Sequence, residues 1–277
     1  MEPRIDKHKV GRSFHKQAGE YDQHASVQKR VVNRLVSLVK SHVDGIPTNI
    51  LDIGCGTGHL LSSLREQFPH SRLNGLDLAY NMTQCAAERL GTGALFVNAD
   101  AEHLPFRNGA FDLLVSTSTL QWLDTLDIFF QQAHRVIHAN GLLCVAFFGG
   151  RTLCELRDCY RDVVLQRSGC SSGYEDRLHR FMDRKSAKNA LERVDFDQAT
   201  IISEIETDYY SNVHDLLRSI KQIGAGASAQ ENSTGGLGWR GILDEVSRIY
   251  SERYGMGDKV PATYEVLYVV ARRRNIV

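Results

Sequence analysis

Residues 49–58 read NILDIGCGTG, and this stretch decides the fold of the 277-residue chain. A short apolar run ends in Asp52, and a turn with three glycines in five positions follows it. A helical pattern then begins at His59. A strand, a glycine-rich loop and a helix in this order let a ligand lie against backbone at the carboxyl end of a parallel strand. Glycine is needed in such a loop because a Cβ would block the ligand or the turn.

Two further strand patterns end in an acid, which indicates the kind of ligand that the loop holds. Asp77 ends the next apolar run, about 25 residues after Asp52, and Asp100 closes the run after that. An acid roughly 20 residues beyond the glycine loop binds ribose hydroxyls in nucleotide-binding folds. The loop itself has no Lys or Arg, and its G-x-G-x-G spacing differs from that of dinucleotide binders. The sequence therefore predicts a site for a neutral or cationic nucleoside, with a tight turn and solvated acids as the plain alternative.

The composition is that of an ordinary soluble globular chain, with 42% hydrophobic and 24% charged residues. Lys plus Arg equals Asp plus Glu at 33 each, which argues against a general nucleic-acid or membrane-surface binder. No apolar run is long enough to span a membrane, and residues 1–7 lack the apolar stretch of a signal peptide. The six cysteines are scattered without a C-x-x-C pair, so we expect a reduced, cytoplasmic protein without a metal site.

Strand and helix patterns alternate over the first 150 residues, which is typical of an α/β fold with right-handed crossovers and a largely parallel sheet. Residues 8–43 are expected to be helical, Asn140–Gly141 to stop a helix or form a turn, and residues 168–173 and 227–238 to form loops. The expected strands cover residues 49–53, 72–78, 95–100, 111–116, 142–148, 199–210 and 262–271. The expected helices cover residues 60–68, 81–90, 126–137, 152–166, 176–194, 213–224 and 239–254.

Three segments together resemble the motifs of the class I S-adenosylmethionine-dependent methyltransferases: the glycine loop, residues 77–82 (DLAYNM) and residues 100–106 (DAEHLPF). The resemblance implies a Rossmann-like fold with a seven-stranded, mostly parallel sheet, an antiparallel last strand and an inserted helical lid. It also implies a division into three parts. Residues 1–45 would form an N-terminal helical flap, residues 46–150 the cofactor-binding core, and residues 151–277 the lid insertions with the last two strands.

The resemblance further implies S-adenosylmethionine as the cofactor, with no metal. Acids and backbone N–H groups at the strand ends would address the ribose and the adenine. Met82 would lie over the adenine or belong to the core, and both interpretations stay open. The residues expected to bind the cofactor are Asp52, Gly54, Cys55, Gly56, Gly58, Asp77, Leu78, Met82, Asp100, Ala101, Glu102 and Ser116.

A narrower resemblance rests on four other segments: residues 21–25 (YDQHA), 120–122 (LQW), 219–225 (SIKQIGA) and 261–266 (PATYEV). Together they are similar to the malonyl-acyl carrier protein O-methyltransferases of biotin synthesis, from about residue 10 to residue 271. The chain departs from that pattern at Val260 and Ala262, where the family has Tyr and Leu, and after Phe181, where it lacks a proline pair. These departures concern the details of substrate binding.

The implied reaction methylates the free carboxylate of a malonyl thioester, carried by acyl carrier protein or coenzyme A. Such a pocket needs a cation, and the bidentate fork of Arg suits a carboxylate better than Lys does. Arg180, expected in a lid helix, is the first candidate and Lys221 the second, although each also fits a solvated helix charge. Tyr21 would bring a phenol from the flap, and Gln121 would bind the acceptor or the cofactor carboxylate.

Basic residues near the lid are expected to dock the acidic carrier protein, unless they form an ordinary solvated face. They are Arg151, Arg157, Arg161, Arg177, Arg184, Lys185 and Lys188. We expect a monomer that binds neither nucleic acid nor a membrane. Two alternatives stay open: a methyltransferase acting on a quinone or another natural product, and a non-catalytic protein that binds S-adenosylmethionine.

Overall fold

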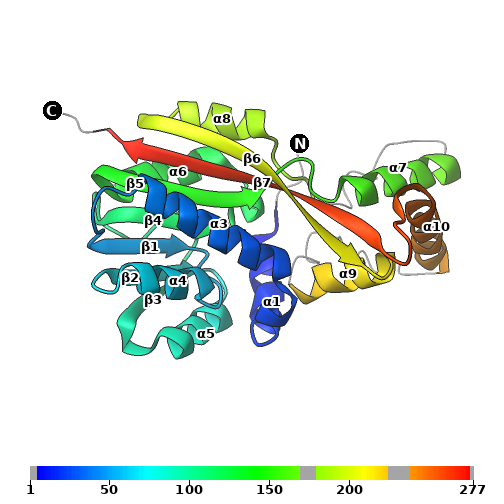
Figure 1. Cartoon of the computed structure of the whole chain (residues 1–277), viewed down its shortest axis with the longest axis horizontal. Helices are drawn as coiled ribbons and strands as arrows, with labels where there is room; N and C mark the ends of the chain where they lie inside the picture. Colours follow the sequence, from blue (N-terminus) through cyan, green and yellow to red (C-terminus); the bar gives the residue numbers. More distant parts are fainter. Residues whose placement is uncertain (1–4, 169–178, 224–236, 275–277) are drawn as a thin grey trace.

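A seven-stranded sheet with the order β3-β2-β1-β4-β5-β7-β6 forms the centre of the chain (Figure 1). The structure is a computed structural model that describes residues 5–168, 179–223 and 237–274. Strands β1 to β5 are parallel, and β7 runs antiparallel to both β5 and β6. The predicted α/β fold with a mostly parallel sheet and an antiparallel last strand is therefore confirmed. The strands are β1 (Asn49–Ile53), β2 (Arg72–Asp77), β3 (Ala94–Asn98), β4 (Phe111–Thr117), β5 (Ile137–Phe148), β6 (Phe196–Tyr210) and β7 (Val260–Arg273).

Helices cover both faces of the sheet, which is why the central strands are apolar on both sides. Successive residues of β1 point to opposite faces, so that Ile50 belongs to one apolar cluster and Leu51 to the other. The cluster around Ile50 includes residues of α3 (Ser26–His42), α4 (His59–Gln67) and α5 (Tyr80–Leu90). The cluster around Leu51 includes residues of α6 (Leu126–Val136) and α8 (Arg184–Glu192). Helix α8 thus packs over the sheet beside α6.

Strands β6 and β7 continue past the other strands as a two-stranded ribbon (Figure 1). Pairing of β7 with β5 ends at Val266, whereas pairing with β6 continues to Val260. This ribbon carries α7 (Cys154–Ser168), α9 (Val213–Gln222) and α10 (Leu237–Tyr254). Helices α7 and α10 lie side by side, joined by ion pairs such as Arg253 to Asp162 at 2.6 Å. The ribbon helices therefore extend the molecule at the end of the sheet where β1, β4 and β5 finish.

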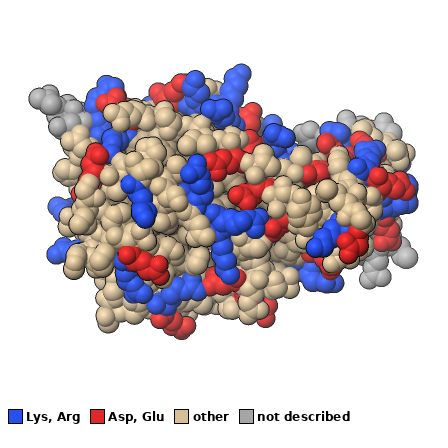
Figure 2. Space-filling view, in the orientation of Figure 1, with Lys and Arg blue, Asp and Glu red and all other residues tan. Residues whose placement is uncertain are grey.

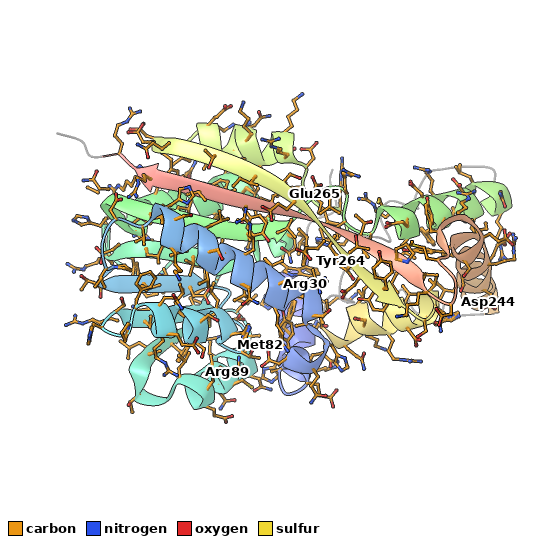
Figure 3. The ribbon with its side chains drawn as sticks, in the orientation of Figure 1. Arg30, Met82, Arg89, Asp244, Tyr264 and Glu265 are labelled. Atoms are coloured by element: carbon orange, nitrogen blue, oxygen red, sulfur yellow. The ribbon has the colours of Figure 1, made fainter. Side chains whose placement is uncertain are left out.

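Arginines of α3 fasten the first part of the chain to the outer strand β6. Arg30, which Figure 3 labels, donates from Nε to Glu206 at 2.6 Å. Arg34 pairs with Glu204 at 2.6 Å. Both arginines are about 40% exposed, at 39% and 42%, so each pair contributes no more than about 1 kcal/mol. Their main effect is to fix where α3 crosses β6.

Three details differ from the sequence prediction. The N-terminal helical region is divided into α1 (Lys7–Gln17), α2 (Tyr21–His24) and α3, because the chain turns at residues 18–20 and again at Ala25. Asn140 does not end a helix: α6 has already ended at Val136, and Asn140, with φ +68°, lies inside β5 next to an irregularity in its pairing with β4. The predicted helix over residues 176–194 is wrong for residues 179–183, which are not helical.

Several predictions fall outside the described residues. They are most of the two loops at 168–173 and 227–238, the Gly224–Ala225 end of the SIKQIGA segment, and Arg177. The division into flap, core and lid at residues 45 and 150 stays a prediction.

Candidate active site

A pocket lies at the carboxyl ends of β1 to β4, where the sequence predicts the ligand. About 720 Å³ of space lies between its walls, part of it continuous with solvent. Helices α1 and α2 close it on the side away from the sheet. Its walls include Lys7, Val10, Gly11, Phe14, Tyr21, Gly54, Gly56, Asp77, Leu78, Met82, Asp100, Ala101, Ser118, Thr119 and Trp122.

Asp77, at the end of β2, is held in the pocket by two backbone N–H groups. Gly56 N donates to its Oδ2 at 2.9 Å and Ala79 N to its Oδ1 at 2.8 Å. Burial raises the pKa of this carboxyl to about 6, although the backbone donors act in the opposite direction. The two bonds fix the carboxylate and leave each oxygen with a further lone pair for a ligand hydroxyl.

Asp52, at the end of β1, is a buried acid without a hydrogen-bond partner. Its side chain is 1% exposed, and neither oxygen is bonded within the described structure. Burial, and then the nearby charge of Asp77, raise the pKa of Asp52 well above its usual range. A buried carboxyl left unpaired in this way is costly, and a cationic or hydrogen-bond-donating ligand would offset that cost.

The three glycines of the loop have different physical roles. A Cβ on Gly54, where φ is +68°, would lie 2.0 Å from Thr119 Oγ1. A Cβ on Gly58 would lie 3.0 Å from the Ala86 Cβ, so that this glycine serves the packing of the loop on α5. A Cβ on Gly56 would meet nothing within 4 Å. Gly56 lines the pocket, so its missing side chain leaves room for a ligand.

The predicted acids after β3 bind a lysine that the sequence analysis did not single out. Lys7 Nζ lies 2.8 Å from Asp100 Oδ2 and also pairs with Glu102. Burial opposes the ionisation of Asp100, but the Glu102 N–H and the Lys7 ammonium hold its pKa below the usual range. Glu102 is only 3% exposed and also accepts from Thr125 N at 3.3 Å. Lys7 therefore joins α1 to the rim of the pocket.

The segment from α1 to α2 is fixed to the core by side chains at both of its ends. Asp22 accepts from Thr57 Oγ1 at 2.8 Å and pairs with Arg89 of α5. The Phe14 ring lies 6.3 Å from Tyr21 and 5.7 Å from Trp122. Tyr21 thus lines the pocket, and burial raises the pKa of its phenol above the usual range.

The structure brings part of the predicted cofactor set together. Gly54, Gly56, Asp77, Leu78, Met82, Asp100 and Ala101 line the pocket. Asp52, Cys55, Gly58, Glu102 and Ser116 are not among its walls. Ser116, fully buried in β4, donates to Ile53 O at 2.7 Å and so joins two strands. Burial raises the pKa of the Cys55 thiol far above its usual range, which leaves it protonated.

Residues 179–183 are not helical, and this changes the interpretation of Arg180. His179 and Phe181 point inward, with their ring centroids 4.6 Å apart, and Arg180 is exposed. The expectation that Arg180 lies in a lid helix is therefore wrong. Lys221, in α9, is also exposed and does not line the pocket.

Gln121 and His179 lie behind the pocket wall formed by Trp122. Gln121 lies in the short 3-10 helix η2 (Leu120–Trp122) and donates from Nε2 to Ser118 O at 2.8 Å. The His179 ring lies 4.6 Å from Trp122. Sequence reasoning missed His179, because the helical pattern over residues 176–194 does not indicate that this side chain points inward.

Comparison with known proteins agrees with this geometry. Residues 51–145 match the family model of the methyltransferase domain. The fold is similar to that of the YcgJ protein from Bacillus subtilis, with a TM-score of 0.59 and 15% identity over 88% of this chain and 99% of that one. It is also similar to phosphoethanolamine N-methyltransferase 2 from Haemonchus contortus, with a TM-score of 0.53 and 19% identity over 88% of this chain and 53% of that one.

Among the relatives that match nearly the whole chain are two malonyl-[acyl-carrier protein] O-methyltransferases. The protein from Geobacter sulfurreducens is 43% identical over 97% of this chain and 100% of its own length. The protein from a Methylovorus species is 35% identical over 95% of this chain and 88% of its own length. This likeness includes the ribbon helices as well as the methyltransferase domain. The chain therefore belongs to the malonyl-[acyl-carrier protein] O-methyltransferase family.

Proposed function

We propose that this protein methylates the free carboxylate of malonyl-acyl carrier protein with S-adenosylmethionine, at the start of biotin synthesis. One observation carries the proposal: the 43% identity to a malonyl-[acyl-carrier protein] O-methyltransferase extends over 97% of the chain. Malonyl-coenzyme A is the second candidate substrate, because it presents the same malonyl thioester. The reaction gives a neutral methyl ester at the end that was charged.

The chain's own residues fit S-adenosylmethionine, which supplies an electrophilic methyl group on a sulfonium when it is bound. Asp77 is positioned to accept from ribose hydroxyls, and Gly56 leaves space beside it. The buried Asp52 carboxyl does not line the pocket, so it would act on the positive charge of this cofactor only from a distance. Met82 and Ala101 offer apolar surface for the adenine, next to Asp100.

The carboxylate acceptor needs orientation more than it needs a base, because a carboxyl group is already ionised at neutral pH. Tyr21 lines the pocket, and its raised pKa keeps the phenol protonated. The phenol therefore acts as a hydrogen-bond donor that holds one carboxylate oxygen while the other attacks. Phe14 and Trp122 exclude water around it.

A cation near the pocket entrance would balance the charge of the substrate. Arg180 remains our first candidate, because it directly follows His179, which packs on the pocket residue Trp122. Lys221 of α9 remains the second. Lys7 also lines the pocket, but Asp100 and Glu102 already pair with it.

Docking of an acidic carrier protein would use basic residues around α7 and α8. Some of those predicted for this role are already engaged, such as Arg161 with Asp158 at 3.0 Å and Lys188 with Glu192 at 3.5 Å. Arg151 and Lys185 are exposed, and we propose that they contact the carrier. Acidic and basic side chains are interspersed over the face shown in Figure 2, which favours a local contact over a broad basic surface.

We further propose a cytoplasmic monomer. The described part of the chain holds no helix that is both long and apolar enough to cross a membrane. The described cysteines are all free thiols, as expected in a reducing compartment.

A methyl-transfer assay with labelled S-adenosylmethionine tests the function. Malonyl-acyl carrier protein, malonyl-coenzyme A, free malonate and a quinone are compared at equal concentration. We expect the malonyl thioesters to be methylated and the other acceptors to remain unlabelled. Arg180→Ala should lower kcat/KM on the malonyl thioester by about 100-fold, with little change in cofactor affinity. Arg180→Lys should restore little of this kcat/KM, because Lys lacks the bidentate fork of Arg. Labelling of the quinone alone would favour the alternative function.

A further inference from the structure

Three buried polar atoms without partners gather around η2, beside the wall of the cofactor pocket. They are Ser118 Oγ, Gln121 Oε1 and His179 Nε2. Only six such side-chain atoms occur in the described structure, and two of the others belong to Asp52. An unpaired buried polar atom typically costs about 1–3 kcal/mol, so a cluster of them beside a pocket points to a ligand that satisfies them.

The ring of His179 is held in one orientation. It lies 4.6 Å from Trp122, tilted by 45°, and 4.6 Å from Phe181, at 75°. The ring makes a hydrogen bond to the backbone of Gln121. Because Nε2 is the nitrogen without a partner, Nδ1 donates this bond and Nε2 presents a lone pair.

The cluster is built to accept hydrogen bonds. Burial lowers the pKa of His179 to about 4, so the ring is neutral at physiological pH and Nε2 accepts. Gln121 is oriented by its Nε2 donation to Ser118 O, which leaves Oε1 as an acceptor. Ser118 adds a hydroxyl that can donate or accept. A carboxylate, which only accepts, does not fit two acceptors, whereas an N–H group does.

Aromatic rings lead from this cluster toward the base of the ribbon. The ring centroid of Phe181 lies 6.5 Å from that of Phe148, which lies 5.7 Å from that of Tyr264 on β7. Figure 3 labels Tyr264. Tyr264 in turn is 3.3 Å from the Tyr210 hydroxyl. The polar cluster is thus followed by a row of packed rings that runs toward the ribbon.

We propose that Ser118, Gln121 and His179 form a subsite for an amide N–H group of the thiol arm that carries the malonyl thioester. The inference rests on the proposed function. Acyl carrier protein and coenzyme A both attach acyl groups to a thiol arm that contains amides in an otherwise apolar chain. An amide N–H would donate to Gln121 Oε1 or His179 Nε2, or be shared between them, and place the malonyl end at the pocket. His179 and Gln121 then act as positioning and specificity residues.

Two small thioesters test the subsite. Malonyl-N-acetylcysteamine contains one amide, and the malonyl thioester of pentanethiol replaces that amide with methylene groups. Wild-type protein should show a kcat/KM at least about tenfold higher for the amide substrate than for the pentanethiol thioester. The pentanethiol thioester leaves the buried acceptors unpaired, which costs binding free energy. His179→Phe keeps a ring against Trp122 and removes the acceptor, so the ratio should fall to about one.

Matched variants separate this role from a structural one. His179→Gln places an amide oxygen near the position of Nε2 and should restore part of the preference. His134 also packs against an aromatic ring, Phe196 at 5.1 Å, but on α6 away from the pocket, so His134→Phe should leave the ratio at its wild-type value. Cofactor affinity should stay unchanged in all three variants.

The outcomes distinguish the two proposals. Equal use of both thioesters by wild-type protein, or an unchanged preference in His179→Phe, overturns the subsite and leaves the methyltransferase function intact. A buried water satisfying the three atoms would give this result. If wild-type protein methylates neither of these thioesters nor malonyl-acyl carrier protein while it methylates another acceptor, the proposed function fails and the subsite fails with it.

Discussion

The ammonium of Lys7 lies 2.8 Å from the carboxylate of Asp100, so that the first helix is tied to the end of β3 across the mouth of the pocket. The same ammonium pairs with the buried Glu102. The acids that the sequence predicts around the adenine are therefore already neutralised by the protein itself. This pairing makes α1 part of the pocket.

Lys7→Met should loosen α1, because it leaves Glu102 buried without a cationic partner. We expect amide hydrogens in residues 7–17 to exchange several-fold faster, together with a loss of roughly 1–3 kcal/mol in stability. Lys16→Met, on the exposed side of the same helix, is the control and should leave exchange unchanged. Equal exchange in the two variants would show that Lys7 does not hold α1 in place.

Cofactor binding should depend on the ionisation of Asp77, whose pKa is raised to about 6. In the unfolded chain the Asp77 carboxyl has a pKa of 3.8. Its contribution to folding stability is therefore fully present below pH 3.8 and is lost as the pH rises through about 6. Ligand hydroxyls prefer the ionised form, so the affinity for S-adenosylhomocysteine should fall as the pH drops through about 6. Calorimetric titration should show Asp77→Ala about ten- to a hundred-fold weaker and without this pH step.

Asp52→Asn should stabilise the ligand-free protein and weaken cofactor binding. The raised pKa of Asp52 means that ionising it in the folded protein costs free energy at neutral pH. Removing that cost should raise the free energy of unfolding at pH 7 by roughly 1–3 kcal/mol, and the gain should vanish below about pH 4. Chemical denaturation at both pH values measures this. A less stable variant at pH 7 would mean that the carboxylate has a partner.

Gly54 and Gly56 should respond differently to substitution. Gly54→Ala forces a Cβ onto Thr119 Oγ1, a contact of 2.0 Å, and should destabilise the fold by roughly 1–3 kcal/mol more than Gly56→Ala does. Gly56→Val should strain the loop, because φ at Gly56 is +52°, and should also lose cofactor binding, because its side chain enters the pocket. Thermal unfolding of the three variants measures the difference in stability, and ligand titration measures their affinity for the cofactor. Normal cofactor affinity in Gly56→Val would sink the assignment of the loop.

Local patterns were sufficient to predict the glycine loop, the strand-end acids and the alternation of strands and helices. Each is encoded by residues close together in the chain: the acid Asp77 follows its own apolar strand, and Gly56 lies in the turn that it shapes. The predicted seven-stranded sheet and its antiparallel last strand came from the family resemblance, and the structure confirms both.

Long-range contacts decided what the sequence did not reveal. Lys7 acts on acids 93 and 95 positions away, which no local pattern indicates. Residues 179–183 have a helical composition, but the segment is not helical, and Phe181 packs on Phe148 and His179 on Trp122. That conformation exposes Arg180 and turns His179 inward. The predicted site therefore included the correct segment, but the side chain that points inward is that of His179 and not that of Arg180.

Intact-mass spectrometry of malonyl-acyl carrier protein, after incubation with this protein and S-adenosylmethionine, tests the central claim most directly. The account predicts that one methyl group replaces the proton of the malonyl carboxyl, and that mild alkaline hydrolysis of the ester removes it. Acetyl-acyl carrier protein, which lacks that carboxyl, should keep its mass. An unchanged mass of the malonyl form under conditions where the cofactor binds, or a methyl group on the central malonyl carbon, would contradict the account.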